Sequence, residues 1–217
     1  MPVQKPQNKL APSIKTIAST PRAWQRMLSG RRLDLLDPSP LDIEISDIAH
    51  GLARVARWNG QTAGDHAFSV AQHSLIVADI ANALSPGLSA KWQLAALLHD
   101  SAEYVIGDLI SPFKAAIGLD YKTFEIKLLA AVHMRVGIPV APPQKIERLI
   151  KSADRMAAFY EATVLAGFNE EEAQKFFGVP KNLNNVLTEQ LCNLEPLPSY
   201  KAQDDFLKHY EHLSQDL

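Results

Sequence analysis

Residues 94–114 read LAALLHDSAEYVIGDLISPFK, and this stretch carries much of the chemistry available to the chain. An apolar run leads directly into His99 and Asp100, and two more carboxylates follow at Glu103 and Asp108. The run predicts a buried helix that draws the His-Asp pair toward the interior, where an unpaired carboxylate is costly. We therefore expect a cation or another partner beside Asp100.

Composition sets the broad class of the protein. A chain of 217 residues suits one domain, and 22 basic against 24 acidic residues give a net charge of -2. This balance provides no basic surface for a nucleic-acid polymer or an anionic membrane, so a small ligand is expected. The single cysteine, Cys192, cannot form an internal disulfide, and the first residues lack the apolar run of a signal peptide. No apolar run is long enough to cross a bilayer. A cytoplasmic location is expected.

Apolar periodicity and capping residues predict helices through most of the chain. Two short alternating segments, 31–36 and 41–45, flank a turn rich in proline and predict one small hairpin. The expected fold class is all-α, with six to eight helices. The expected organisation is an N-terminal arm at 1–29, one domain at 30–180, and a helical extension at 181–217 that packs on the same domain. The expected helices cover about 47–58, 69–84, 89–107, 120–136, 143–165, 169–178 and 199–213.

Four residues have the types needed to hold one divalent cation: His73, His99, Asp100 and Asp154. Two imidazoles and two carboxylates suit a borderline first-row metal and leave coordination positions for water and substrate. Each residue also has an ordinary explanation. His73 fits a hydrogen-bonded core histidine, the His-Asp pair fits polar residues at a helix end, and Asp154 fits a solvated ion pair with a nearby lysine or arginine. Three helices packed together would favour the metal site.

The pattern resembles a known family. His73, the LLHDSAE segment and Asp154 in an SADRMAAF helix are similar to the H...HD...D signature of the HD-domain metal-dependent phosphohydrolases. Arg57-Trp58, the QHS setting of His73, and GDLISPFK at 107–114 further resemble the bacterial 5'-deoxynucleotidase branch. Small deoxynucleoside triphosphohydrolases of phages and bacteria share much of this pattern. The resemblance covers about residues 30–165.

The resemblance implies an HD-domain helical bundle with one catalytic divalent cation, which could be cobalt, manganese, zinc, nickel, iron or magnesium. Carried over by position, His73, His99, Asp100 and Asp154 are the metal ligands. Glu103 orients or deprotonates the attacking water, and Asp108 assists the leaving group or binds substrate. Arg57 holds phosphate and Trp58 faces the sugar. The resemblance also suggests a homodimer.

Two further residues are candidates for the substrate side. Lys114 offers a point charge to a phosphate, although a surface lysine is an equal reading. His66 lies in the loop before the helix that starts at Ser69, and it is either on the substrate side or structural.

The main hypothesis is a metal-dependent nucleotide phosphohydrolase, most simply a 5'-deoxynucleotidase that converts a deoxynucleoside monophosphate to a deoxynucleoside and phosphate. One alternative is a deoxynucleoside triphosphate triphosphohydrolase that uses the same site. Another is a non-catalytic module that keeps the HD pocket to bind a ligand. The phosphorus product separates the two enzymes, and metal retention without hydrolysis favours the module.

Overall fold

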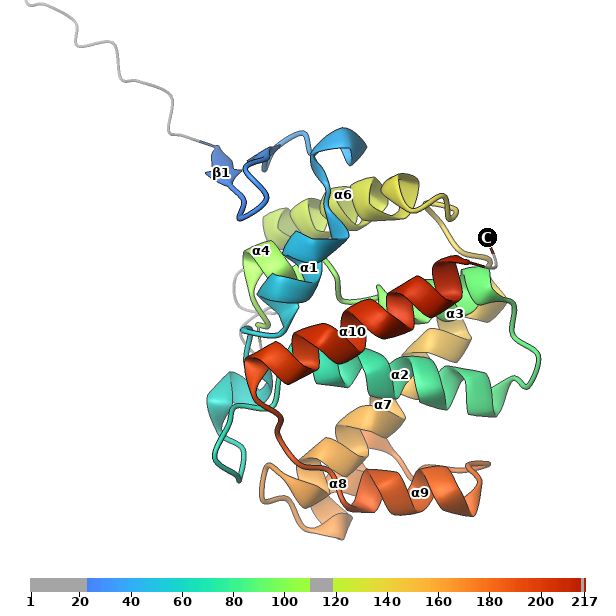
Figure 1. Ribbon diagram of the computed structural model, residues 1–217. Coiled ribbons are helices and arrows are strands. Elements are labelled where there is room, and N and C mark those ends of the chain that lie inside the picture. The colour runs from blue at the N-terminus through green and yellow to red at the C-terminus, as the bar shows by residue number, and fades with distance from the viewer. Residues whose placement is uncertain (1–22, 110–118, 216) are drawn as a thin grey trace, which may run out of the picture.

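The computed structural model describes residues 23–109, 119–215 and 217, and within them the protein is a helical bundle with one small hairpin (Figure 1). The central helix, α2 (Val70–Leu84), packs against α7 (Gln144–Val164), α3 (Ala90–Leu97) and α10 (Ser199–Ser214). Its buried face is continuous from Val70 to Ala81. The apolar core therefore surrounds α2, and the residues at the start of this helix lie in the interior.

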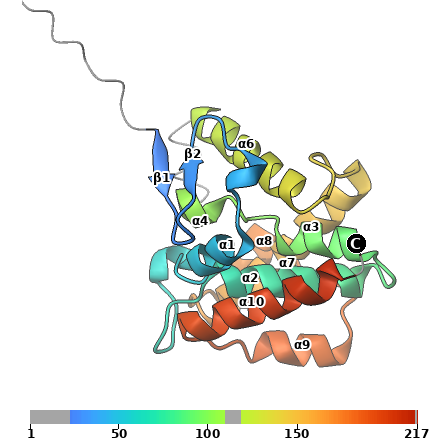
Figure 2. The ribbon, with the colours of Figure 1, turned by 45° about the horizontal axis from the view of Figure 1, so that its top comes forward.

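The remaining elements cover this centre. On one side, α1 (Ile45–Leu52) contacts α4 (Glu103–Ile106) and α10, and α6 (Leu119–Arg135) lies against a 3-10 turn at Pro40–Asp42. On the other side, α7 contacts α8 (Glu170–Phe177) and α9 (Asn185–Cys192). Turning the molecule shows α10 crossing in front of α2, with α9 beneath (Figure 2). None of the described helices combines the length and apolar character needed to cross a bilayer.

The small hairpin pairs β1 (Trp24–Arg26) with β2 (Arg32–Asp34), in the register Trp24 opposite Asp34. The prediction of a hairpin is confirmed, but its expected partner strand at 41–45 is wrong. Asp34 Oδ1 accepts from the backbone N–H groups of Leu36 and Asp37, which ends β2 in a turn. The chain then enters the 3-10 turn at Pro40–Asp42 instead of a second strand.

The expected helix at 47–58 ends early, at Leu52. Beyond it, the backbone of Val55 and Arg57 pairs with Phe68 and Val70 through hydrogen bonds of 2.8 and 3.0 Å. This extended pairing competes with helix formation, and a 3-10 turn at Arg57–Gly60 follows it. Arg57 and Trp58 therefore lie in a turn that faces the start of α2.

The expected helix at 89–107 divides into α3 and α4. Hydrogen bonds of the i to i−3 type at His99, Ser101 and Glu103 tighten the chain between them. Gly107, with φ 76°, ends α4 as expected. The structure also contains α9, which was not expected and which Asn184 caps by accepting from Leu187 N. The described ranges thus hold nine α-helices, more than the predicted six to eight.

Glycine at position 51 permits a close approach of α1 to α4. A Cβ atom at Gly51 would lie 2.7 Å from Tyr104 Cβ and 3.0 Å from the Tyr104 carbonyl oxygen. Such distances are shorter than van der Waals contact, so a larger residue forces one backbone to move. Gly51 thereby sets the position of α4, the helix that begins with Glu103.

The segment before α10 is tied to the first turn of α2. The buried side chain of Gln72 donates to Glu195 O and accepts from Leu197 N, both at 2.9 Å. Pro196, between them, lies against Gly64, where an added Cβ would come within 3.0 Å of the proline ring. Residues 195–197 therefore close over the loop and helix start that precede His73.

Candidate metal centre

Three elements bring the four predicted ligands together. His73 lies in the first turns of α2, which Ser69 caps by accepting from Gln72 N. His99 and Asp100 occupy the tight turn after α3, and Asp154 is in the middle of α7. One ligand atom from each of His73, His99 and Asp154 lies within 4.8 Å of the others.

Asp100 completes this cluster. Its Oδ2 atom lies 3.2 Å from His99 Nε2 and 3.5 Å from His73 Nε2, while Asp154 Oδ1 lies 3.3 Å from His73 Nε2. The two imidazole rings are 5.2 Å apart between centroids. The donor atoms of two histidines and two aspartates thus converge, which is the arrangement that a mixed nitrogen and oxygen metal site requires.

The outer ring nitrogens of both histidines are already engaged. His73 Nδ1 lies 2.5 Å from Glu161 Oε1, and His99 Nδ1 lies 2.8 Å from the Ala96 carbonyl oxygen. These acceptors favour a proton on Nδ1, which leaves the Nε2 lone pair of each ring for a cation. Both Nε2 atoms are buried, and neither forms a hydrogen bond of ordinary geometry. The residues therefore fit a divalent cation bound through His73 and His99 Nε2.

The electrostatics of the cluster also favour a cation. Burial alone would raise the pKa of Asp100 and of Asp154, but the adjacent imidazoles hold both values below their usual range. Burial and Arg57 act to lower the pKa of His73, but Glu161 and the two aspartates outweigh them and raise it well above its usual value. The cluster stabilises positive charge at His73 Nε2, where a proton or a metal ion can supply it.

Glu161 is a buried residue of this site that the sequence interpretation missed. It is fully buried, and its Oε2 atom accepts from Trp58 Nε1 at 2.9 Å and from Arg57 Nη2 at 3.2 Å. Burial alone would raise its pKa, but Arg57 and His73 lower the pKa to about 2. Glu161 follows Asp154 by seven residues, or two helical turns, so the two lie on one face of α7. That spacing was the signal available in the sequence.

Arg57 and Trp58 lie next to the cluster, in the turn before α2. The Arg57 guanidinium contacts Glu161 on one side, and its Nη1 atom lies 3.6 Å from Asp108 Oδ2 on the other. The Trp58 ring contacts Phe168 and Phe177, with centroid distances of 5.7 and 5.8 Å. Both residues thus lie beside the His-Asp cluster, and each of them is hydrogen-bonded to Glu161.

The two predicted catalytic carboxylates, Glu103 and Asp108, follow the His99-Asp100 pair in the chain, and both are largely buried. Glu103 is 1% exposed and begins α4, three residues after Asp100. Asp108 follows the glycine that ends α4, and its side chain is 9% exposed. A turn at 98–102 separates α3 from α4, so His99 and Glu103 do not lie on one continuous helix.

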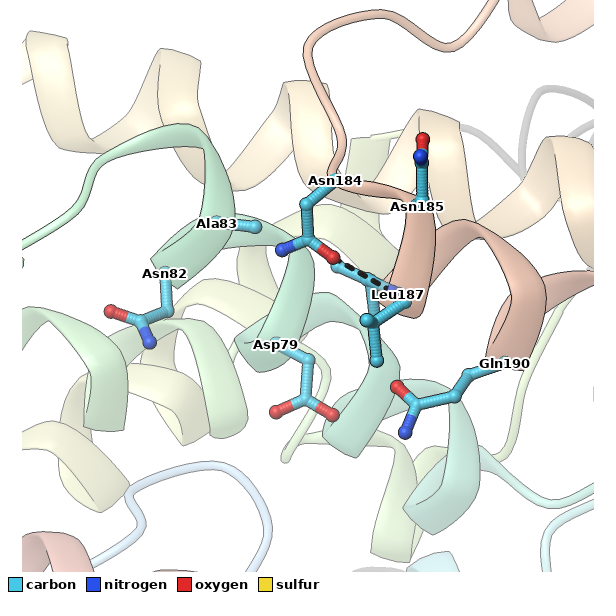
Figure 3. A pocket seen from close by; sticks show the side chains of 8 residues that line it. Asp79, Asn82, Ala83, Asn184, Asn185, Leu187 and Gln190 are labelled. Carbon is cyan, nitrogen blue, oxygen red and sulfur yellow. Dashed lines mark hydrogen bonds between the residues drawn. The ribbon is translucent and has the colours of Figure 1, made fainter.

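Two candidates remain, His66 and Lys114. His66 is exposed in the loop before α2. Lys114 lies outside the described residues. An open polar groove of about 630 Å³ lies elsewhere, between the second half of α2 and the start of α9 (Figure 3). Amide side chains such as Asn82, Asn184 and Gln190 surround it, and it includes none of the predicted site residues.

Comparison with known proteins gives matches of three kinds, to a family model, to a protein sequence and to a solved structure. The family model described as "HD domain" matches residues 70–158, the span that contains the four clustered residues. An uncharacterised protein of Rhodobacter capsulatus is 57% identical over 182 residues, which cover 83% of this chain and 91% of that protein. A solved structure of an HD phosphohydrolase (DatZ) from cyanophage S-2L, bound to dA and one catalytic zinc ion, covers 81% of this chain and 99% of that chain. Its sequence identity is 19% and its TM-score is 0.45.

Proposed function

We propose that this chain, whose residues 70–158 match the HD domain family, is a metal-dependent phosphohydrolase and, more closely, a nucleotidase. The proposed reaction is hydrolysis of a deoxynucleoside 5'-monophosphate to a deoxynucleoside and inorganic phosphate. The proposed ligands of the divalent cation are His73, His99, Asp100 and Asp154.

The observation that carries the proposal is the state of the two histidines. Each ring has its Nδ1 atom on an acceptor and its buried Nε2 atom near a carboxylate of the cluster. A core histidine without a ligand would be expected to satisfy both nitrogens by hydrogen bonds. Two such rings beside two aspartates support a cation site rather than an ordinary polar core.

The surrounding residues fit the needs of phosphoryl transfer. A bound divalent cation makes a coordinated water more acidic and offsets charge on the phosphate. Glu103, buried three residues after Asp100, is proposed to orient the attacking water and accept its proton. Asp108 is proposed to act on the leaving-group side, where the neighbouring Arg57 guanidinium neutralises charge on the phosphate oxygens.

The substrate class is argued from the turn that carries Arg57 and Trp58. A planar guanidinium recognises phosphate, and the adjacent indole offers an apolar surface to a sugar or base. Both side chains are held close to the metal cluster by Glu161. Lys114 is proposed as a further phosphate contact, and His66 as a residue of the substrate entrance. A homodimer is proposed as the oligomeric state, to be measured by sedimentation.

A panel of divalent cations against nucleoside mono-, di- and triphosphates, with the phosphorus product identified by 31P NMR, tests the function. The expected result is inorganic phosphate from deoxynucleoside monophosphates, only in the presence of a cation. Tripolyphosphate from triphosphates would assign the chain to the deoxynucleoside triphosphate triphosphohydrolases instead. Tight metal binding with no hydrolysis of any nucleotide would contradict the proposal and favour a ligand-binding module.

A further inference from the structure

We propose that Glu161 is a positioning residue that holds the metal ligand His73 and the Arg57–Trp58 turn in one fixed relation. The inference rests on the proposed function, because it assigns roles to the metal site and to the substrate side. It goes further by making the two sides of the site depend on one buried carboxylate. Glu161 itself is not assigned as a metal ligand or as a contact of the substrate.

Both oxygens of Glu161 are used, and they face different parts of the site. Oε1 lies 2.5 Å from His73 Nδ1, which sets the orientation of the ring and directs Nε2 at the cluster. Oε2 accepts from Trp58 Nε1 at 2.9 Å and from Arg57 Nε and Nη2 at 3.3 and 3.2 Å. One carboxylate thus joins α2 to the turn that precedes it.

The backbone of this turn needs to be held in place. Trp58 has φ 56° and ψ 28°, and Asn59 has φ 51° and ψ 31°, so two successive residues with side chains adopt the left-handed region. Such conformations are costly and persist where the surroundings enforce them. The bond from Trp58 Nε1 to Glu161, together with the contacts to Phe168 and Phe177, supplies that enforcement.

Burial makes a carboxylate the fitting side chain at this position. The side chain of Glu161 is 0% exposed and that of Arg57 is 13% exposed. A guanidinium in such a place requires a negative partner, and an amide at 161 would leave its charge poorly compensated. The same substitution would weaken the acceptor for His73 Nδ1. One substitution, Glu161→Gln, should therefore disturb both His73 and the Arg57–Trp58 turn.

The test compares Glu161→Gln with Trp58→Phe and with the control Glu147→Gln. Glu147 is an exposed glutamate in the first turn of the same helix, so the control makes the same chemical change away from the site. Calorimetric titration of metal-free protein with Zn2+ or Mn2+ gives the metal Kd without any assay of activity. Steady-state kinetics at saturating metal then give kcat and KM.

Glu161→Gln should weaken metal binding by about 10- to 100-fold, the range typical of residues that orient a ligand. It should also raise KM at saturating metal. Trp58→Phe removes only the indole donor, and it should raise KM while changing the metal Kd less than about 3-fold. A metal Kd in folded Glu161→Gln equal to that of the control would overturn the inference.

A second variant covers the case in which Glu161→Gln does not fold. Arg57→Met combined with Glu161→Gln removes the uncompensated guanidinium together with the carboxylate. His73 still loses its charged acceptor there, so weaker metal binding remains the expected result, and unchanged binding would again overturn the inference. If the wild-type protein hydrolyses no nucleotide, the proposed function fails, but the metal titrations still decide the role of Glu161.

Discussion

Asp154→Asn should weaken metal binding while leaving the stability of the metal-free protein nearly unchanged. Asp154 Oδ1 lies 3.3 Å from His73 Nε2, but the side chain is 38% exposed. Solvent screens an ion pair at such a position, so the metal-free variant should lose at most about 1 kcal/mol of stability. The variant keeps the size of the side chain and removes one anionic donor from the proposed cation site.

The loss should be larger in the presence of the cation. A ligand at 100 times its Kd stabilises the folded state by about 2.7 kcal/mol. For a domain of this size, 1 kcal/mol corresponds to about 2 to 4 °C in Tm, so wild-type protein should gain about 5 to 11 °C. Asp154→Asn should lose most of this gain at the same cation concentration.

Differential scanning calorimetry, with chelator and with added cation, measures both quantities. Glu147→Gln is the control, because it makes a carboxylate-to-amide change at an exposed position of α7. An equal cation-induced rise in Tm for wild type and Asp154→Asn, across a titration of the cation, would refute the assignment of Asp154 as a ligand.

Three other outcomes follow from the structure. Glu103→Gln should retain metal affinity but lower kcat by about 100- to 10,000-fold, and unchanged turnover would remove Glu103 from the mechanism. Burial lowers the pKa of His133 below its usual 6.5, so the unfolded chain binds this proton more readily and stability should fall as pH drops below that value. Denaturant unfolding in chelator should show a shallower pH dependence for His133→Gln, and an identical one would contradict this. Gly51→Ala should cost about 1 to 3 kcal/mol in urea unfolding because of Tyr104, whereas a stabilised variant would show that α1 and α4 separate easily.

The sequence predicted the helical fold class because apolar periodicity and capping residues act locally. Ser69 caps α2 as its sequence indicated, and Gly107 ends α4. The errors arose where distant backbone decided the structure. Residues 55–57 leave the helix because they pair with residues 68–70, and β2 pairs with a strand that precedes it. Such pairing is not visible in the periodicity of a single segment.

In the candidate site too, local signals were readable from the sequence and contacts between distant residues were not. His73, His99, Asp100 and Asp154 were identified by residue type and setting, and the structure brings them into one cluster. Glu161 was missed because its importance comes from three partners, two of which lie more than one hundred residues away in the chain. Its sequence neighbours give only a helical face. A residue that acts by holding other site residues, as Glu161 does, is therefore the hardest to find from a sequence.

The tie between Gln72 and residues 195–197 bears on how far the chain can be shortened. The span recognised as an HD domain ends at residue 158, yet the acceptor and donor of the Gln72 amide lie at Glu195 and Leu197. A protein truncated before these residues would leave a buried amide without partners, one residue from His73. The segment between α9 and α10 thus supports the first turn of α2, and fusions or tags placed there would remove the partners of Gln72.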